Sequence, residues 1–347
     1  MPISPRSHPR LSPLWRRRAA IFGASRRGRI SLLLFGVVFL LSMGANFIAN
    51  DKPFLMVYRG RLYFPPVERI AEQRFGPDFL PTEADYTNPA VQAAIRAHGW
   101  MLWPPIPYRY DSIVWNASLA PAPPDAHHWL GTDEVSRDVL ARVLYGLRLS
   151  ILFGFSLTIV ASAIGIIAGA VQGFYGGYTD LLFQRFIEIW SGMPQLFLLI
   201  ILAGIIAPSF WILLFFLLLF SWMTLTGVVR AEFLRARNLD YVRAAKALGL
   251  PDWRIMLRHM LPNAMIATLT FLPFILSDSI TLLASLDFLG FGMPPGSPSL
   301  GELVSEAKDN LQAPWLGLTA FAALGGVLIM LIFIGEAVRD AVDPRKS

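Results

Sequence analysis

Six apolar stretches of membrane-spanning length constrain this sequence more than any other feature. A hydrocarbon core about 30 Å thick needs roughly 20 residues of helix to cross it. Charged residues make up only 16% of the 347 residues, against about 25% in an ordinary soluble domain. We therefore expect an all-α polytopic membrane protein with six transmembrane helices rather than a soluble enzyme. The stretches are 30–49, 149–171, 187–207, 210–229, 264–286 and 315–338.

Two boundaries in this series carry further information. The stretch 30–49 is about twice as long as the apolar core of a signal peptide, so we expect a retained first transmembrane helix. Only Pro208 and Ser209 separate the third stretch from the fourth. A proline there would break a single long helix, which favours a tight helical hairpin.

Lysine and arginine counts predict how the chain is oriented. The tail 1–29 holds eight Arg and no acid, and 230–263 holds seven basic residues against three acids. The segments 50–147 and 287–314 each carry more acids than bases. The positive-inside rule then places 230–263 and both termini, including the C-terminal tail 339–347, in the cytoplasm. The net charge of +6 is thus an orientation signal beside anionic lipid, and no nucleic-acid partner is expected.

Between the first two transmembrane helices, 50–147 forms the one sizeable segment outside the membrane, ahead of a core of five transmembrane helices over 148–338. Its periodic parts are a short helical patch near 88–98 and an amphipathic helix at its end. We expect Thr132 or Asp133 to cap the amphipathic helix, which leads straight into the second transmembrane helix. The charged residues off its apolar stripe are Arg137, Asp138 and Arg142.

Glycines recur at every fourth residue in and just after the second transmembrane stretch, at 165, 169, 173 and 177. Small residues at that spacing let another helix approach closely, so we expect them to pack inside the bundle. The chain has neither a cysteine nor a GxxxxGK[ST] phosphate-binding loop. We therefore expect no cofactor, no metal site and no catalytic residue in this chain.

The cytoplasmic segment 230–263 is predicted to begin with a short docking helix. Asn238 or Asp240 can cap a helix over 241–248. Gly249 then lies where a positive φ ends a helix. The small side chains expected on the exposed face are Ala244, Ala245 and Ala247.

The rest of the segment is predicted to form a second short helix. This helix is expected to run from Pro251 to about Met260 and to end at 261–263, before the fifth transmembrane helix begins. A simple connector would need only a few residues, whereas 230–263 is 34 residues long. The length favours a knob that docks on another protein.

Within this segment, 243–249 (RAAKALG) followed by 259–262 (HMLP) resembles the "EAA" motif of binding-protein-dependent ABC importer permeases. The Ala-Ala, Gly and Leu-Pro positions match in register, whereas Arg243 replaces the motif's Glu and His259 its Ile. Other stretches are similar to the dipeptide/oligopeptide (OppC/DppC-like) subfamily, and the long outer loop resembles YejE-type permeases. These stretches are 128–137, 286–301 and 336–345.

The resemblance implies an ABC type I importer permease fold in the bacterial inner membrane, with a periplasmic segment between the first two helices. It also implies a heterodimer with a second permease subunit, two ATPase domains that hydrolyse ATP, and a periplasmic solute-binding protein. The substrates implied are peptides or peptide-like solutes. The residues expected to contact the ATPase are Tyr241, Arg243, Ala244, Ala245, Lys246, Gly249, Arg254, His259, Leu261 and Pro262.

Asp278, inside the fifth transmembrane stretch, supports a different reading. An intramembrane carboxylate is costly and is a functional candidate, so the alternative is an ion-coupled secondary transporter that uses Asp278. Within the importer interpretation, Asp278 is a candidate residue of the transport pathway. An intramembrane enzyme is disfavoured because no histidine lies inside a span and Asp278 has no second intramembrane Asp beside it.

Overall fold

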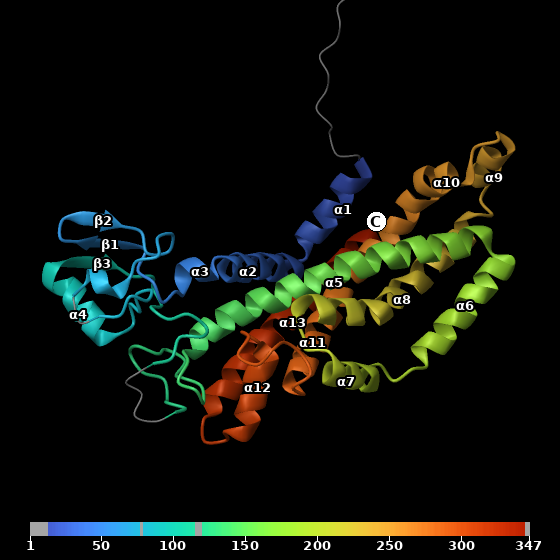
Figure 1. The fold of residues 1–347 in the computed structure, drawn as a ribbon. Coiled ribbons are helices and arrows are strands. Elements are labelled where there is room, and N and C mark those ends of the chain that lie inside the picture. The colour runs from blue at the N-terminus through green and yellow to red at the C-terminus, as the bar shows by residue number, and fades with distance from the viewer. Residues whose placement is uncertain (1–12, 77–78, 115–119, 344–347) are drawn as a thin grey trace, which may run out of the picture.

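One long helix, α5 (Val139–Tyr175), runs the length of the molecule in the computed structural model. A small β-sheet lies beyond one end of α5, and α9 (Asp240–Ala247) and α10 (Asp252–Ile255) lie at the other (Figure 1). The structure describes residues 13–76, 79–114 and 120–343. The outermost parts of both predicted cytoplasmic tails, 1–12 and 344–347, lie outside the described residues.

Within the described ranges, four helical segments are long and apolar enough to cross a membrane. A bent pair of helices, α6 (Gly177–Ser191) and α7 (Gln195–Ile205), would make a fifth. The four segments are α5; α8 (Phe210–Ala236); Asp252–Phe288, which includes α11 (Leu261–Phe288); and α13 (Pro314–Val342).

The first predicted span corresponds to α2 (Arg26–Met43) and the short α3 (Ala45–Ile48). Three arginines occupy the first turn of α2, so its length and composition alone do not establish a span. The helix packs on α13 and α5, and α1 (Pro13–Ala24) also contacts α13. Six transmembrane helices thus remain a prediction. Among the described residues, four or five helical segments have the length and apolar character that a membrane span needs.

The third predicted stretch is not one straight helix. Its helix stops at Gly192 and resumes after Pro194, and α6 and α7 meet there at a bend of 68°. Pro194 lacks the N–H that would continue the ladder of α6, which explains the break. The predicted hairpin turn is present, because α7 ends at Ile205 and the Ser209 hydroxyl caps α8.

The glycine repeat packs α5 against α8, as expected. A Cβ added to Gly165, Gly169 or Gly173 would lie 2.5–2.6 Å from an atom of α8, including the carbonyl oxygens of Trp222, Thr226 and Arg230. The two backbones therefore approach more closely than any larger side chain would permit. The fourth glycine of the repeat, Gly177, instead begins α6.

The segment outside the bundle contains a small sheet that the sequence pattern did not reveal. Three antiparallel strands lie in the order β2-β1-β3, and the predicted helical patch forms α4, which Asn88 caps by accepting from the Ala90 N–H. Met56, Tyr58 and Ile95 are buried between sheet and helix. The elements are β1 (Leu55–Tyr58), β2 (Arg61–Tyr63), a 3-10 turn (Glu72–Arg74), α4 (Pro89–His98) and β3 (Gly99–Leu102).

Replacing Gly169 by valine should destabilise the protein by about 1–3 kcal/mol, because the new side chain would force α5 and α8 apart. Thermal unfolding of the detergent-purified protein measures this change. Gly325→Val on α13 is the control, since no described atom lies within 4 Å of its added Cβ. Equal melting temperatures for the two variants would contradict the packing argument.

Candidate functional site

The predicted docking helix exists, and it is fastened to the bundle by one apolar face. On α9, Val242 and Ala245 are buried and pack in one cluster with Ile255, Met260 and Phe233. Ala245 was expected on the exposed face, and this expectation is wrong. The buried face is held by apolar contact, which leaves the opposite face of α9 open.

A glycine turn ends α9 as the sequence predicts. Gly249 has φ +75°, its N–H donates to the Lys246 carbonyl at 2.9 Å, and the Leu250 N–H donates to the Ala245 carbonyl at 3.2 Å. This pair of bonds is a Schellman motif, which needs a positive φ at the glycine. It leaves the Leu248 side chain 81% exposed at the tip.

The predicted side-chain cap of this helix is absent. The capping position is Leu239, whose side chain makes no cap hydrogen bond, so neither Asn238 nor Asp240 caps α9. Asp240 lies instead in the first turn, where its carboxylate favours the positive end of the helix dipole.

The second short helix does not end at 261–263. It begins as α10, passes through a π-helical turn (Met256–Met260) and continues without interruption into α11. Pro262 has no N–H to donate to the preceding turn, and the wider π turn absorbs this, with the Leu261 N–H bonding to the Met256 carbonyl. The knob therefore consists of α9 and of α10, which is the end of one long membrane helix.

Most residues expected to contact an ATPase lie on the open surface of this knob. Tyr241 and Lys246 also tie it to the bundle: the Asn263 amide donates to the Tyr241 hydroxyl at 3.3 Å, and the Lys246 Nζ lies 4.5 Å from the centre of the Phe174 ring on α5. The exposed residues are Tyr241, Arg243, Ala244, Lys246, Gly249, Arg254 and Pro262; His259 and Leu261 are half-buried.

Asp278 lies on the wall of a half-open cavity of about 460 Å³, beside the break between α6 and α7. Its side chain is exposed to this cavity, and the described residues offer it neither an ion pair nor a hydrogen bond. The cavity is lined by Ser191, Met193, Gln195, Phe220, Ser221, Met223, Thr224, Ile275, Asp278, Ser279 and Leu282.

At the opposite end of the bundle, the structure corrects the predicted amphipathic helix. Neither Thr132 nor Asp133 is its cap: α5 begins at Val139, and the Asp138 carboxylate caps it by accepting from the Ala141 N–H at 2.8 Å. Residues 133–138 form a turn in which Asp133 Oδ1 accepts from the Val135 and Arg137 N–H groups. The charged face that was placed off the apolar stripe, formed by Arg137, Asp138 and Arg142, is buried.

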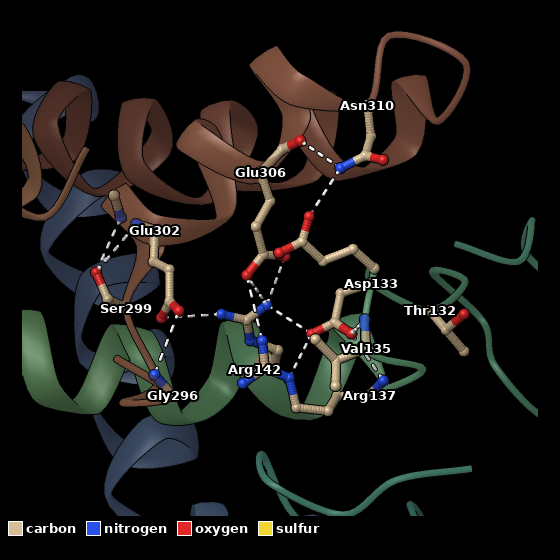
Figure 2. Close-up of polar contacts among 12 residues, drawn as sticks. Thr132, Asp133, Val135, Arg137, Arg142, Gly296, Ser299, Glu302, Glu306 and Asn310 are labelled. Carbon is tan, nitrogen blue, oxygen red and sulfur yellow. Dashed lines mark hydrogen bonds and ion pairs between the residues drawn. The ribbon is translucent and has the colours of Figure 1, made fainter. Parts of the chain in front are cut away.

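Arg142 is at the centre of this buried face (Figure 2). Its Nη1 lies 2.6 Å from both Asp133 Oδ2 and Glu306 Oε1, and its Nη2 lies 3.1 Å from Glu302 Oε2. Arg137 Nε also contacts Asp133, at 2.6 Å. These contacts, hereafter the Arg142 cluster, join the turn before α5 to α12 (Leu300–Asp309).

The sequence held a signal for the Arg142 cluster that the helical pattern concealed. The acid-rich segment 287–314 needs cations, and Arg137 and Arg142 occupy a stretch otherwise rich in apolar residues. Buried charges require partners, so these groups could have been paired. Treating the arginines as a solvated helix face missed that pairing.

Residues of 286–301, one of the stretches that resemble the OppC/DppC-like subfamily, form the turn between α11 and α12 and hold it together. Asp287 accepts from the Ser299 hydroxyl at 2.5 Å and from the Met293 N–H at 2.6 Å. Ser299 in turn caps α12, and a Cβ added to Gly301 would overlap the Ala284 carbonyl oxygen. These residues pack α12 tightly against α11.

Comparison with known proteins gives a consistent result. The family model described as "Binding-protein-dependent transport system inner membrane component" matches residues 142–347. The "Inner membrane ABC transporter permease protein YejE" of Escherichia coli is 57% identical over 97% of this chain and 99% of that protein. The "Peptidoglycan transport system permease protein YejE" of Agrobacterium fabrum is 55% identical over 98% of this chain and 95% of its own length. The "Oligopeptide transport system permease protein OppC" of Lactococcus lactis is 35% identical over 65% of this chain and 78% of that protein.

Replacing Arg142 by methionine should cost about 3–5 kcal/mol of stability, because it leaves buried carboxylates without their cation. Arg148→Met is the matched control, since Arg148 lies on the same helix but its contact to Asn46 is exposed. Thermal unfolding of both purified variants provides the comparison. A loss of stability no greater for Arg142→Met than for the control would contradict the role of the cluster.

The Arg142 cluster should also make stability depend on pH. It holds three carboxylates against two guanidinium groups, and burial raises the pKa of Glu306 from 4.5 to about 7. Glu306 in the folded protein then holds a proton between these pH values that the unfolded chain has lost. Its contribution to stability is therefore largest below pH 4.5 and falls as the pH rises to 7. Melting temperatures across pH 5 to 8 should therefore decline, as far as Glu306 governs them, and Glu306→Gln should flatten the decline. An unchanged slope in that variant would assign the pH dependence to other groups.

Proposed function

Because the chain belongs to the family of binding-protein-dependent transport system inner membrane components, we propose that it forms half of a transmembrane pathway and that 240–262 couples it to separate ATPase subunits. The chain is a multi-pass inner-membrane permease. The observation that carries the coupling proposal is the knob at α9, which presents an open face while its other face is packed into the bundle.

The mechanical connections of the knob support coupling. The π turn makes α10 and α11 one continuous segment, so a displacement of the knob moves a membrane helix directly. Lys246 connects α9 with the end of α5, which reaches the opposite end of the bundle. ATP binding would shift the permease between inward- and outward-facing states only by its differential affinity for them.

A second permease subunit has a suitable surface at α6. No residue of α6 (Gly177–Ser191), all of which lies in the described part of the chain, is buried, although many of these residues are large and apolar. Arg185 and Glu188 are exposed on the same helix, and charged groups are poorly suited to face lipid. A protein partner in a heterodimer satisfies both features.

The same arrangement favours a cytoplasmic location for both termini. In Figure 1, α1 and the C-terminal end of α13 lie toward the end of the bundle that carries α9 and α10. The sheet and α12 lie toward the other end, where a periplasmic solute-binding protein would deliver substrate. The basic residues at the first end agree with the positive-inside rule.

Peptides or peptide-like solutes are the proposed substrates, because the names of the relatives include oligopeptide and peptidoglycan transport. ATP would be hydrolysed by two partner ATPase domains, since this chain has no phosphate-binding loop motif. Family membership supports this importer over an ion-coupled secondary transporter that uses Asp278.

Gly249→Val tests the coupling proposal. A β-branched residue is strained at φ +75°, so the turn that positions Leu248 and the exposed face should distort. We expect the assembled complex to lose most of its substrate-stimulated ATPase activity, by about tenfold, while membrane insertion stays normal. The measurement is ATP hydrolysis by the purified complex with and without loaded binding protein.

The matched control is Gly60→Val. Gly60 also has a positive φ, +72°, and no described atom lies within 4 Å of its added Cβ, but it lies in the turn between β1 and β2. Its strain should be similar and its effect on coupling small. Normal stimulation in a fully assembled Gly249→Val complex would reject the docking role.

A further inference from the structure

The cavity beside the α6–α7 break has the features of a binding site for a cationic group. We propose that Asp278 binds the protonated amino group of the transported peptide as it passes through the membrane. This inference rests on the proposed function, and it assigns the site of recognition to this chain as well as to the binding protein.

The first step of the argument is that Asp278 differs from the paired acids of the structure. Asp180 receives a bidentate contact from Arg230, at 2.5 and 2.6 Å, and Asp133 and Glu306 share Arg142. Asp278 has no cation beside it within the described ranges. An unpaired carboxylate in the middle of a membrane helix is costly, so it is retained where it serves a ligand or a pathway.

The remaining lining of the cavity suits a peptide backbone. The Gln195 Nε2 group is buried and has no hydrogen-bond partner among the described residues, so it can donate to a carbonyl oxygen. Ser221 and Ser279 already donate to their own helices, at 2.8 Å each, which leaves their oxygens as acceptors. Apolar residues supply the rest of the wall, and about 460 Å³ lies within the range of small-molecule sites.

The chemistry favours an ammonium group over a metal ion. The described residues contain no group of three His, Cys, Asp or Glu side chains that could hold a metal. An ammonium group needs only one carboxylate and a few neutral acceptors, and the resulting charge-assisted hydrogen bond is strong. Because the cavity is half-open, a ligand can enter it.

The test uses the complete importer, with both permease chains, its ATPases and its binding protein, in proteoliposomes. Uptake of trialanine is compared for the wild type and for D278N, D278E and E336Q. Glu336 is the matched control because it is also an exposed acid on a membrane helix, α13, but it does not line the cavity. Binding-protein-stimulated ATP hydrolysis is measured in parallel, together with the amount of assembled complex.

We expect D278N to lower trialanine uptake at limiting concentration by about tenfold to a hundredfold, the range for a hydrogen bond to a charged group. D278E should retain most of the uptake, and E336Q should resemble the wild type. ATP hydrolysis and assembly should be unchanged in all three variants. That combination separates recognition of the amine from a structural role, which would lower assembly and ATP hydrolysis together.

A second measurement tests access to the site. The chain contains no cysteine, so D278C introduces its single thiol. A negatively charged thiosulfonate reagent should react with this thiol from the aqueous phase and restore part of the trialanine uptake, whereas a positively charged one should not. An unreactive thiol in the assembled complex would show that the partner subunit covers the position, and it would overturn the inference.

The two proposals fail in different ways. If the wild-type importer assembles and hydrolyses ATP but takes up no peptide, the proposed function is wrong and this inference falls with it. If the wild type transports trialanine and D278N transports it equally well, the inference alone is overturned. Uptake that collapses with an uncoupler, and not with loss of ATP, would also reject the inference and assign Asp278 to ion coupling.

Discussion

Close contact between α5 and α8 is the interaction on which the rest of the bundle depends. Within hydrocarbon, every backbone polar group must be satisfied inside its own helix, so helices associate through shape and not through exposed backbone. The three glycines at 165, 169 and 173 let the α8 backbone lie directly on α5. With α8 in place, the break between α6 and α7 and the wall of the Asp278 cavity acquire defined positions.

Different kinds of contact hold the two ends of α5. At one end, the Arg142 cluster ties the helix to α12 with buried charges, whose geometry admits little displacement because an unpaired charge there is very costly. At the other end, an apolar face, a cation–π contact and the hydrogen bond from Asn263 to Tyr241 hold α9, and these contacts are weaker than buried ion pairs. A bundle built in this way is fixed at one end and more easily displaced at the end where we propose that the ATPase binds.

The expectations that failed share one cause. Arg137, Asp138 and Arg142 were placed on the polar face of an amphipathic helix at the outer surface, because helical periodicity cannot show what lies opposite a polar stripe. Ala245 was assigned to the exposed face of α9 for the same reason, whereas it is buried in the apolar cluster that includes Phe233 and Ile255. The end of the second cytoplasmic helix was placed at 261–263, but a π turn, which has no sequence pattern of its own, carries the helix past these residues.

Local chemistry determined the all-α membrane class, the approximate positions of the apolar helices, the glycine turn at Gly249 and the small residues of α5. Each of these follows from properties of neighbouring residues: hydrophobic length, backbone freedom and side-chain size. Only the tertiary structure decided that Arg142 is buried, that Asp278 faces a cavity and that β1, β2 and β3 form a sheet beside α4. Those outcomes depend on which distant segments meet, since burial, pairing and cavity shape belong to contacts between elements and not to any one of them.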